Sequence, residues 1–375
     1  MRLMIIAGEA SGDMHGAGVV KELKSRFKDI EIFGIGGNKM QREGMQLVYH
    51  INELAVMGLL EVVKKLPTIR SVSRTLESLL TNRRPDAVLL IDYPGFNLRF
   101  AEKVRKAGIK IFYYISPQLW AWHPNRIKKM KRLVDKMFVV FPFEEEIYKR
   151  AGIDVEFVGH PLLDVIEEPQ PKADFCKRYG FDKSKPIIGL FPGSRKQELE
   201  KIFPPMLHAA KILETGYDAQ IAVGVASVFE GDYVKSFLYE DSSVRLLQNA
   251  TYDLMKNSDV AIVTSGTATL ETACFQTPMV IVYKTSWLTY LAARLMINIK
   301  NIGLANIVAG KTIVPELIQH GAHAEKIAAA AGKFLTDKTL SDKTRIELKS
   351  VYEKLGERGA AKRVAENILK LIAEK

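Results

Sequence analysis

The sequence predicts an α/β protein made of two doubly wound domains, each with a parallel sheet covered by helices. Short apolar, often β-branched runs alternate along the chain with segments of helical periodicity, which is the pattern of βαβ units. The alternation stops at a polar, proline-rich stretch, residues 167–172 (E-E-P-Q-P-K), and then restarts. The length of 375 residues exceeds one typical core and suits two domains of ordinary size.

In the first domain, the apolar runs predict strands that are separated by loops and helices. A helix is expected over residues 14–27, directly after the loop that follows the first strand. The expected strands are 3–7, 31–34, 87–92, 110–115 and a last run, 154–161, that ends in a turn.

The second domain repeats the pattern and is followed by a tail without strand signals. Its expected strands are 186–191, 220–225, 243–247, 259–264 and 279–283. Val364, Ile368 and Ile372 are spaced by four in the last expected helix, which could pack back on the first domain. We therefore predict domains at 1–168 and 169–355, followed by a terminal helix at 356–375. Ligands of such domains bind at the carboxyl ends of the strands, in a cleft where the two domains face each other.

Composition limits the class of the protein without choosing its function. The net charge of +11 attracts nucleic acid, anionic lipid and phosphorylated small molecules alike. We find no signal peptide and no apolar run of about 18 residues, so a membrane span is not expected. Cys176 and Cys274 form no C-x-x-C pair, so the expected compartment is the cytoplasm.

Residues 259–271 (D-V-A-I-V-T-S-G-T-A-T-L-E) predict a nucleotide-binding loop. A buried strand precedes Gly266, and Ser265 or Thr267 can cap the helix expected from residue 268. Free N–H groups at such a helix start suit a phosphate, and Glu271 can accept hydrogen bonds from sugar hydroxyls. An ordinary strand-to-helix connection explains the same residues equally well.

A second loop, residues 190–195 (L-F-P-G-S-R), repeats this logic. Gly193 and Ser194 form the turn, and Arg195 can bind a diphosphate through its fork of donors. No dinucleotide or P-loop motif occurs there, and a solvated arginine is the simpler reading of this loop alone. The presence of two such loops in one domain favours a phosphate-binding role over ordinary connections.

The first domain offers further candidates for contact with a sugar substrate. The loop 8–13 (G-E-A-S-G-D) lacks basic residues, so Glu9 and Ser11 suit sugar hydroxyls better than phosphate, although capping by Ser11 or Asp13 is equally compatible. Asp92 follows a strand among apolar neighbours that could raise its pKa, which suits a general base; the alternative is that Asp92 caps the next helix or holds the turn.

Further first-domain residues fit a substrate pocket or a plain core. Asn97 ends the segment I-D-Y-P-G-F-N, residues 91–97, which also contains Asp92. Trp120 belongs to an aromatic stretch, residues 113–123, that could line an apolar pocket or pack in the core. His15, His123 and His160 lack metal-ligand spacing and no D-x-D pair occurs, so no metal is expected.

Two segments suggest a surface partner. Residues 55–66 are apolar beyond one helical stripe, which suits a membrane interface or, preferably on these residues alone, burial between domains. A cationic run over 126–136 follows Trp120 and Trp122, and suits a membrane surface, nucleic acid or a solvated helix face. The membrane-contact candidates are Val56, Met57, Leu59, Leu60, Val63, Arg126, Lys128 and Lys129.

Taken together in order, the motifs resemble those of the lipid-A-disaccharide synthase family from one end of the chain to the other. They are G-E-A-S-G-D at 8–13, F-G-I-G-G-N-K-M at 33–40, E-G-M at 43–45, L-A-V-M-G at 54–58, I-D-Y-P-G-F-N at 91–97, S-P-Q-L-W-A-W at 116–122, G-H-P-L-L-D at 159–164, F-P-G-S-R at 191–195, S-G-T-A-T-L-E at 265–271, G-L-A-N-I-V-A-G at 303–310 and V-P-E-L-I-Q at 314–319. Gly95 and Ala305 depart from the family pattern.

This resemblance implies a two-domain GT-B glycosyltransferase of lipid A (lipopolysaccharide) biosynthesis. It implies inverting, metal-independent transfer of 2,3-diacylglucosamine from UDP to 2,3-diacylglucosamine 1-phosphate, giving a β-1,6 disaccharide. Asp92 would then be the base, and Arg195, Glu271 and Asn306 would line the UDP site. The candidates for the acceptor side are then Glu9, Ser11, Asn97 and Trp120.

The acyl chains of both substrates turn the preference for segment 55–66 toward the membrane. The resemblance thus implies a cytoplasmic protein, peripheral on the inner membrane of a Gram-negative bacterium, with a homodimer possible. The alternatives are another UDP-sugar enzyme of this architecture, such as a UDP-N-acetylglucosamine 2-epimerase, and a nucleic-acid-binding protein, for which no signature occurs.

Overall fold

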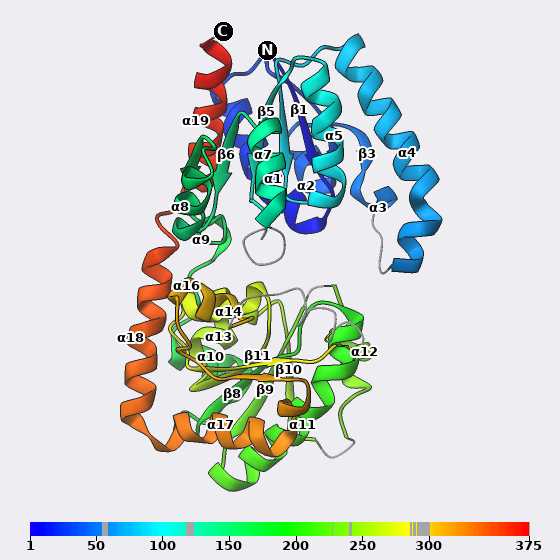
Figure 1. The fold of residues 1–375 in the computed structure, drawn as a ribbon. Coiled ribbons are helices and arrows are strands. Elements are labelled where there is room, and N and C mark those ends of the chain that lie inside the picture. The colour runs from blue at the N-terminus through cyan, green and yellow to red at the C-terminus, as the bar shows by residue number, and fades with distance from the viewer. Residues whose placement is uncertain are drawn as a thin grey trace. The chain divides into compact units, whose positions relative to one another are not determined.

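The chain folds into two compact α/β units (Figure 1). The computed structural model describes residues 1–54, 59–117, 124–226, 228–239, 242–285, 287, 290 and 301–374, and for 54, 59–66 and 124–126 it describes the backbone alone. Unit 1 comprises Met1–Asp164 and Leu355–Lys375, and unit 2 comprises Val165–Lys354. The last helix of the chain therefore belongs to unit 1.

Unit 1 contains a seven-stranded parallel sheet in the order β3-β2-β1-β4-β5-β6-β7. The first six positions follow the dinucleotide-fold order, in which the chain reverses direction across the sheet between β1 and β4. The strands are β1 (Arg2–Ala7), β2 (Glu31–Gly36), β3 (Gln46–His50), β4 (Ala87–Ile91), β5 (Lys110–Tyr114), β6 (Lys136–Val139) and β7 (Val155–Phe157).

The helices of unit 1 cover both faces of this sheet. Helices α4, α5 and α7 pack in sequence on one face, and α1 packs against α19. They are α1 (Ala10–Arg26), α2 (Asn38–Arg42), α3 (Ile51–Leu54), α4 (Leu59–Asn82), α5 (Pro94–Lys106), α7 (Pro124–Leu133), α8 (Pro142–Arg150), α9 (Leu162–Val165, which crosses the unit boundary) and α19 (Ala360–Ala373).

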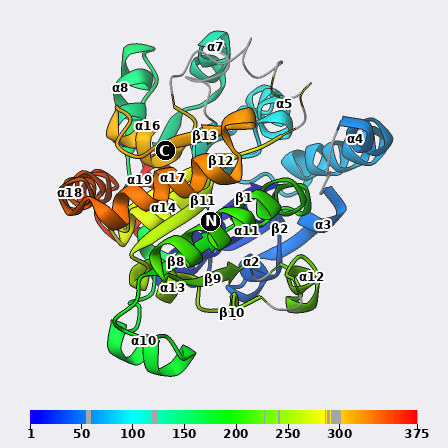
Figure 2. The ribbon, with the colours of Figure 1, turned by 90° about the horizontal axis from the view of Figure 1, so that it is seen from below.

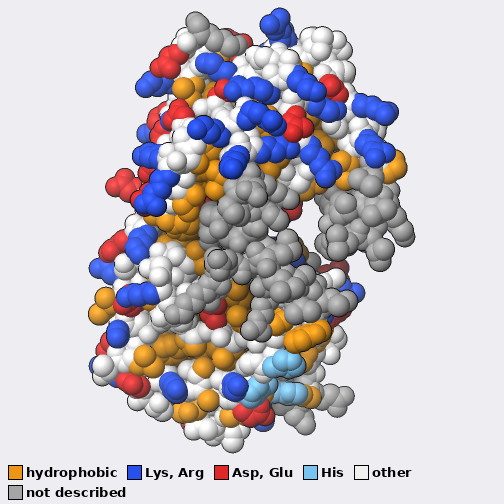
Figure 3. Space-filling view, viewed as in Figure 1, with side chains coloured by type: hydrophobic (Ala, Val, Ile, Leu, Met, Phe, Trp, Pro, Cys, Tyr) orange, Lys and Arg blue, Asp and Glu red, His pale blue; other side chains and the backbone are white. Residues whose placement is uncertain are grey.

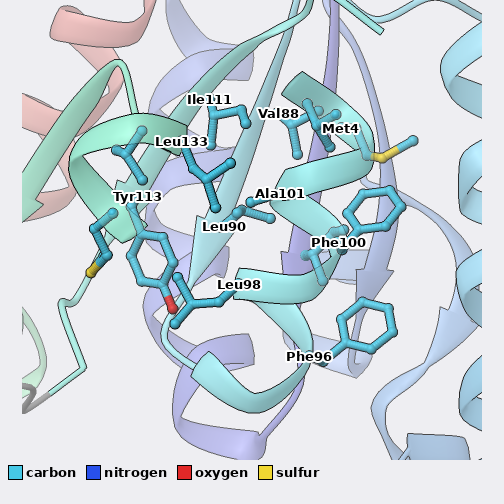
Figure 4. Packing of buried hydrophobic residues seen from close by; sticks show 14 of the residues in the cluster. Met4, Val88, Leu90, Phe96, Leu98, Phe100, Ala101, Ile111, Tyr113 and Leu133 are labelled. Carbon is cyan, nitrogen blue, oxygen red and sulfur yellow. The ribbon is translucent and has the colours of Figure 1, made fainter. Parts of the chain in front are cut away.

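The core under α5 and α7 is built by the strand residues that face these helices. Val88, Leu90, Ile111 and Tyr113 are fully buried there (Figure 4). Aromatic and aliphatic residues of the helices fill the space above them, among them Phe96, Phe100, Ala101 and Leu133. This packing fixes the start of α5 relative to the carboxyl ends of β4 and β5.

Unit 2 contains a six-stranded parallel sheet in the order β10-β9-β8-β11-β12-β13, which reverses between β8 and β11. The strands are β8 (Ile187–Phe191), β9 (Gln220–Val225), β10 (Arg245–Gln248), β11 (Val260–Thr264), β12 (Met279–Tyr283) and β13 (Glu316–Ile318). The helices are α10 (Lys172–Tyr179), α11 (Lys196–Tyr217), α12 (Gly231–Lys235), α13 (Thr251–Asn257), α14 (Thr267–Cys274), α16 (Leu304–Ala309), α17 (Ala324–Thr336) and α18 (Lys338–Lys354), with a 3₁₀ turn, η1 (Gln319–Gly321).

Helices α11 and α17 lie side by side on one face of the second sheet (Figures 1 and 2). Their apolar residues share one core with the strands, including Phe203, Met206 and Ile327. Helices α13, α14, α16 and α18 contact one another in sequence. Both units are therefore doubly wound parallel sheets, and the predicted fold class is confirmed.

Three strands differ from the expected set: β3, β6 and β13 were not predicted. β3 and β13 are edge strands whose residues are mostly half-buried, so they lack an uninterrupted apolar run. β6 is only four residues long and begins at Lys136. Because Lys136 is charged, it belongs to the cationic run 126–136, and too few apolar residues remain to indicate a strand. The apolar runs therefore identified ten of the thirteen strands that the structure describes, and missed two edge strands and one short strand that begins with a lysine.

Candidate active site

The loops that the sequence singled out lie at the reversal point of each sheet. In unit 1, residues 8–13 follow β1 and Asp92 follows β4, and these two strands are neighbours, with Ala7 opposite Ile91. In unit 2, residues 192–195 follow β8 and residues 265–267 follow β11, and Phe191 is opposite Val263. Ligands of doubly wound folds bind at this point.

Asp92 lies in a strained turn between β4 and α5. Its φ is +44°, and that of Tyr93, the N-cap residue of α5, is +48°. The left-handed conformation costs a non-glycine residue about 1–2 kcal/mol, so two in succession require surrounding structure that holds them. The alternative that Asp92 caps α5 is not supported, because the cap position belongs to Tyr93 and has no side-chain cap bond.

Buried groups fix the backbone of this turn. The Asp92 N–H donates to the Tyr114 carbonyl at 3.0 Å. The Asp92 carbonyl accepts hydrogen bonds from the Tyr113 hydroxyl at 2.6 Å and from Nδ2 of Asn97 at 2.7 Å. Asn97, a predicted acceptor-side residue, has no exposed surface and also donates to the Ile91 carbonyl at 3.2 Å. Its role is therefore corrected from substrate contact to support of the turn.

The Asp92 carboxylate is more basic than an ordinary aspartate. Burial raises its pKa to about 6, the nearby Glu9 carboxylate acts in the same direction, and the Tyr93 backbone N–H opposes them. A carboxylate with this pKa is largely ionised at neutral pH and still accepts a proton more readily than a solvated one. The group suits general base chemistry.

The loop after β1 leaves Glu9 and Ser11 exposed at the start of α1. Glu9 is the N-cap residue and makes no side-chain cap bond, so the alternative of capping by Ser11 or Asp13 does not hold at this helix. Asp13 is buried and instead accepts the N–H groups of Gly37, Lys39 and Met40 at 2.7, 3.1 and 3.0 Å. Its carboxylate therefore stabilises the start of α2.

In unit 2, the loop after β8 presents Arg195 to solvent. Gly193 has φ +105°, and a Cβ there would lie 2.6 Å from Oε2 of Glu198. The Arg195 side chain is 77% exposed and pairs with Glu198 at 3.0 Å, while Ser194 is exposed beside it. An exposed ion pair is weak, so the guanidinium can leave it for a phosphate.

The loop after β11 has a different local structure from the one expected. Gly266, with φ +150°, is the N-cap residue of α14 and provides no side-chain cap. Ser265 donates to the Ile302 carbonyl at 3.1 Å, and Thr267 is the exposed first residue of the helix. The predicted caps are thus wrong, and the first N–H groups of α14 have no side-chain cap of their own.

Glu271 lies on the second turn of α14, half-buried, and has an elevated pKa. Burial raises it to about 7, whereas a hydrogen bond with the Tyr252 side chain of α13 acts in the opposite direction. Tyr252 was not predicted as a site residue, because nothing in the sequence indicates that α13 packs against α14.

Asn306 also differs from its prediction. Its side chain is fully buried in unit 2. Its Nδ2 donates to the Val314 carbonyl at 2.9 Å and to Glu316 at 2.7 Å, and its Oδ1 accepts the N–H groups of Ile313 and Val314 at 2.8 and 3.1 Å. Glu316 in turn accepts the N–H groups of Ile302 and Gly303. Asn306 therefore holds the loop around α16, and both its Nδ2 and its Oδ1 are bonded to protein groups.

A cavity of about 340 Å³ lies at the carboxyl ends of β9 and β10, on the same edge of the second sheet. Sequence reasoning did not find it, because its polar groups come from segments without a motif. Its lining residues are Val225, Ala226, Phe229, Glu230, Gly231, Gln248 and Asn249.

Several predicted residues lie outside the described parts of the structure. Trp120, Val56 and Met57 are among them, and for Leu59, Leu60, Val63 and Arg126 only the backbone is described. Lys128 is exposed on α7, and Lys129 pairs with Glu102 at 2.8 Å.

Basic side chains gather over the outer surfaces of α5 and α7 in unit 1 (Figure 3). We call this surface the α5–α7 basic face; it comprises Arg99, Lys103, Lys106, Lys128, Lys129 and Arg132. Glu102 lies among these cations and pairs with Lys129 and Arg132.

Two further kinds of site are absent from the residues that the structure describes. No cluster of three or more histidine, cysteine or acidic residues suited to a metal ion occurs among them. None of the helices they form is long and apolar enough to cross a membrane.

The whole chain is similar to known proteins of one family. Residues 3–370 match the model of the family described as lipid-A-disaccharide synthetase. The chain is 43% identical over its whole length to the lipid-A-disaccharide synthase of Geobacter sulfurreducens, covering 98% of that protein. It is also 43% identical to that of Syntrophus aciditrophicus, over 99% of this chain and 97% of the relative.

Solved structures share the fold at low sequence identity. The Neisseria meningitidis UDP-GlcNAc 2-epimerase bound to UDP-GlcNAc has a TM-score of 0.66 at 14% identity, with coverage of 99% and 100% of the two chains. Acinetobacter baumannii MurG has a TM-score of 0.59 at 14% identity, covering 98% of this chain and 99% of its own. These likenesses support the predicted GT-B-like architecture, and the full-length family match decides the assignment: the chain belongs to the lipid-A-disaccharide synthase family.

Proposed function

We propose that the protein transfers 2,3-diacylglucosamine from UDP to 2,3-diacylglucosamine 1-phosphate in lipid A biosynthesis. The products are the β-1,6-linked disaccharide 1-phosphate and UDP. The observation that carries the proposal is Asp92, a carboxylate with a pKa near 6 in a strained turn at the reversal point of the first sheet, within a chain of this family.

In the proposed reaction, Asp92 accepts the proton of the acceptor 6-hydroxyl. The oxygen then forms its bond to the anomeric carbon of the donor while the bond from that carbon to the diphosphate breaks, and UDP leaves with the electron pair. One displacement inverts the anomeric configuration and requires no covalent sugar intermediate. The protein must supply a base, alignment and stabilisation of the leaving group.

The residues proposed to bind the UDP of the sugar donor come from unit 2. Arg195 can turn from Glu198 to the diphosphate, and the first N–H groups of α14 add partial positive charge from the helix dipole. Glu271, in its ionised form, can accept hydrogen bonds from the ribose hydroxyls. Gly193, Ser194, Ser265, Gly266 and Thr267 form the two loops, while Asn306 supports the wall behind them.

We further propose that the protein acts on the cytoplasmic face of the inner membrane as a peripheral protein. Its substrates carry acyl chains, and the α5–α7 basic face would attract anionic lipid headgroups at about 1 kcal/mol for each cation near the surface. Segment 55–66 supplies apolar residues that could enter the interface.

The defining test is an assay with labelled UDP-2,3-diacylglucosamine, detergent-solubilised acceptor and the purified protein. Formation of a disaccharide that depends on the acceptor is expected. Asp92→Asn should keep UDP binding, measured by thermal shift, and lose at least about a hundred-fold in turnover, because proton transfer commonly contributes that much. Sugar conversion without any acceptor would support the 2-epimerase alternative, and an unchanged rate for Asp92→Asn would remove Asp92 from the mechanism.

The membrane proposal is tested by sedimentation with vesicles of anionic and of zwitterionic phospholipid. Lys128→Glu combined with Arg132→Glu should weaken binding to anionic vesicles, most clearly at low salt. Lys338→Glu combined with Lys343→Glu makes the same change of charge on α18 in unit 2 and serves as the control. Equal losses in both double variants would attribute binding to net charge alone and contradict a role for the basic face.

A further inference from the structure

The backbone of Asp92 is held by two adjacent residues of the neighbouring strand. On β5, the Tyr114 carbonyl accepts the Asp92 N–H at 3.0 Å, and the Tyr113 hydroxyl donates to the Asp92 carbonyl at 2.6 Å. Asn97 adds a second donor to the same carbonyl at 2.7 Å from the first turns of α5. Both side-chain donors are fully buried.

We propose that Tyr113 and Asn97 are positioning residues for Asp92: their hydrogen bonds keep the turn left-handed and thereby aim the carboxylate at the acceptor hydroxyl. This inference rests on the proposed function of Asp92 as the base. It adds that the aim of the base is set by a buried tyrosine that makes no contact with the substrate.

The strain of the turn explains why such holding groups are needed. Asp92 and Tyr93 both have positive φ, and a rotation about the N–Cα bond of Asp92 toward ordinary angles would relieve the strain at this residue. That rotation would carry the Asp92 carbonyl away from Tyr113 and Asn97 and change the direction of the Cα–Cβ bond. The two donors therefore oppose the change that would move the carboxylate.

The packing of Tyr113 separates its hydroxyl from its ring. The ring belongs to the core cluster with Leu98, Ile111 and Leu133, which a phenylalanine would fill equally well (Figure 4). Tyr114 is also fully buried, and within the described part of the chain its hydroxyl has no hydrogen-bond partner. Of the two hydroxyls, that of Tyr113 bonds to the Asp92 turn, whereas Tyr114 bonds to the turn through its backbone carbonyl.

This difference provides a matched pair of variants. Tyr113→Phe should lower kcat by about ten-fold or more while the KM values of both substrates change by less than about three-fold, because the aim of the base changes and binding surfaces do not. Tyr114→Phe removes the same atom from the adjacent residue but keeps the backbone carbonyl that accepts the Asp92 N–H, so it should leave kcat unchanged. Thermal unfolding of both variants establishes that they are folded. Equal kcat values for Tyr113→Phe and Tyr114→Phe would overturn the proposal.

A double-variant cycle excludes a purely structural effect. In the Asp92→Asn background, Tyr113→Phe should cause no further loss of the residual rate, because the base that it positions is gone. Asparagine is used because, like aspartate, it tolerates the left-handed conformation. A loss of the same factor in both backgrounds would show that Tyr113 acts independently of Asp92 and overturn the inference. Full activity of Asp92→Asn alone would instead overturn the base assignment, and the positioning role with it.

Discussion

At the scale of single residues, the position of Asp92 gives its carboxylate two properties that a base requires. Burial and the Glu9 carboxylate raise its pKa, and hydrogen bonds to the backbone fix its direction. The residue lies one position beyond a buried strand, at the edge where ligands bind in doubly wound sheets. Its chemistry therefore follows from its location.

The elevated pKa of Asp92 predicts how the rate depends on pH. The base is active when ionised, so kcat/KM should rise with pH through about 6 and then level off. The measurement is a rate profile between pH 5 and 9 under subsaturating substrate. Glu271, with a pKa near 7, is the other described acid that could contribute in this range. Glu271→Gln should therefore keep the rise of kcat/KM near pH 6. If the rise of kcat/KM near pH 6 persisted in Asp92→Asn and disappeared in Glu271→Gln, the assignment of this rise to Asp92 would be contradicted.

Glu271 allows a second prediction, which concerns stability. Its pKa is raised from 4.5 to about 7, so the native state holds this proton more tightly than the unfolded chain does. Its contribution to the free energy of unfolding therefore falls as pH rises through about 4.5–7, by roughly 1–3 kcal/mol. Glu271→Gln removes this loss and should raise the Tm relative to the native protein more at pH 8 than at pH 5.

The same variant tests the role of Glu271 in ligand binding. An amide is a weaker acceptor than a carboxylate for ribose hydroxyls, so UDP should produce a smaller thermal shift in Glu271→Gln. Exposed Glu353, on α18, provides a control as Glu353→Gln, which should change neither the pH dependence nor the shift with UDP. An unchanged UDP shift in Glu271→Gln would remove the ribose contact from the proposal.

The sequence identified residues whose role depends on strand ends and missed those whose role depends on burial. Asp92, Arg195 and Gly266 follow apolar runs, so their place at the sheet edge could be predicted. Asn97 and Asn306 also lie in motifs, yet their amide nitrogens donate to backbone carbonyls, and in Asn306 also to the Glu316 carboxylate, 5–10 positions away in the sequence. A motif indicates that a residue matters and leaves open whether it faces the ligand or the loop behind it.

At the scale of elements, the turn after β4 depends on the loop after β1. A Cβ on Gly8 would lie 2.2 Å from Cδ1 of Tyr93, so the Tyr93 ring occupies the space that a larger residue would need. Gly8→Ala should force the ring and the Asp92 turn to move. We expect a loss of about 1–3 kcal/mol in stability and a larger fall in kcat than in UDP binding, measured by denaturant unfolding and the transfer assay.

Gly95 is the matched control for this prediction. It lies in the first turn of α5, and a Cβ there would meet no atom within 4 Å. Gly95→Ala should therefore leave stability unchanged or raise it by up to about 1 kcal/mol, because alanine favours the helix. If Gly8→Ala behaved like Gly95→Ala, the Gly8–Tyr93 contact could not be what fixes the turn.

Elements differ in how well their sequence reveals them. The central strands β1, β4, β8 and β11 are buried on both faces and read as apolar runs, whereas the edge strands β3 and β13 do not. Helix starts were harder still: the structure places Glu9 and Gly266 at cap positions without side-chain caps. Capping depends on backbone angles at one residue, which composition does not determine.

At the scale of the whole molecule, the chain leaves unit 1 after Asp164 and returns to it at Leu355. Helix α19 then packs along α1, and Val364, Ala365 and Ile368 are fully buried. The spacing of four among Val364, Ile368 and Ile372 indicated an amphipathic helix, but only the fold identifies the surface that it covers. Unit 1 is thus completed by residues from the far end of the sequence.

This arrangement predicts that a cavity in α19 destabilises unit 1 in particular. Ile368→Ala removes a fully buried side chain and should lower the stability of unit 1 by about 2–4 kcal/mol. Ile346→Ala makes the same change on α18 in unit 2, where the side chain is 70% exposed, and should change stability by less than about 0.5 kcal/mol. Hydrogen exchange read residue by residue should show lost protection in α1 and β1 for Ile368→Ala, with β8 and β11 unchanged. Equal loss of protection in both sheets would mean that the two units unfold as one, and that α19 stabilises the whole chain and not unit 1 alone.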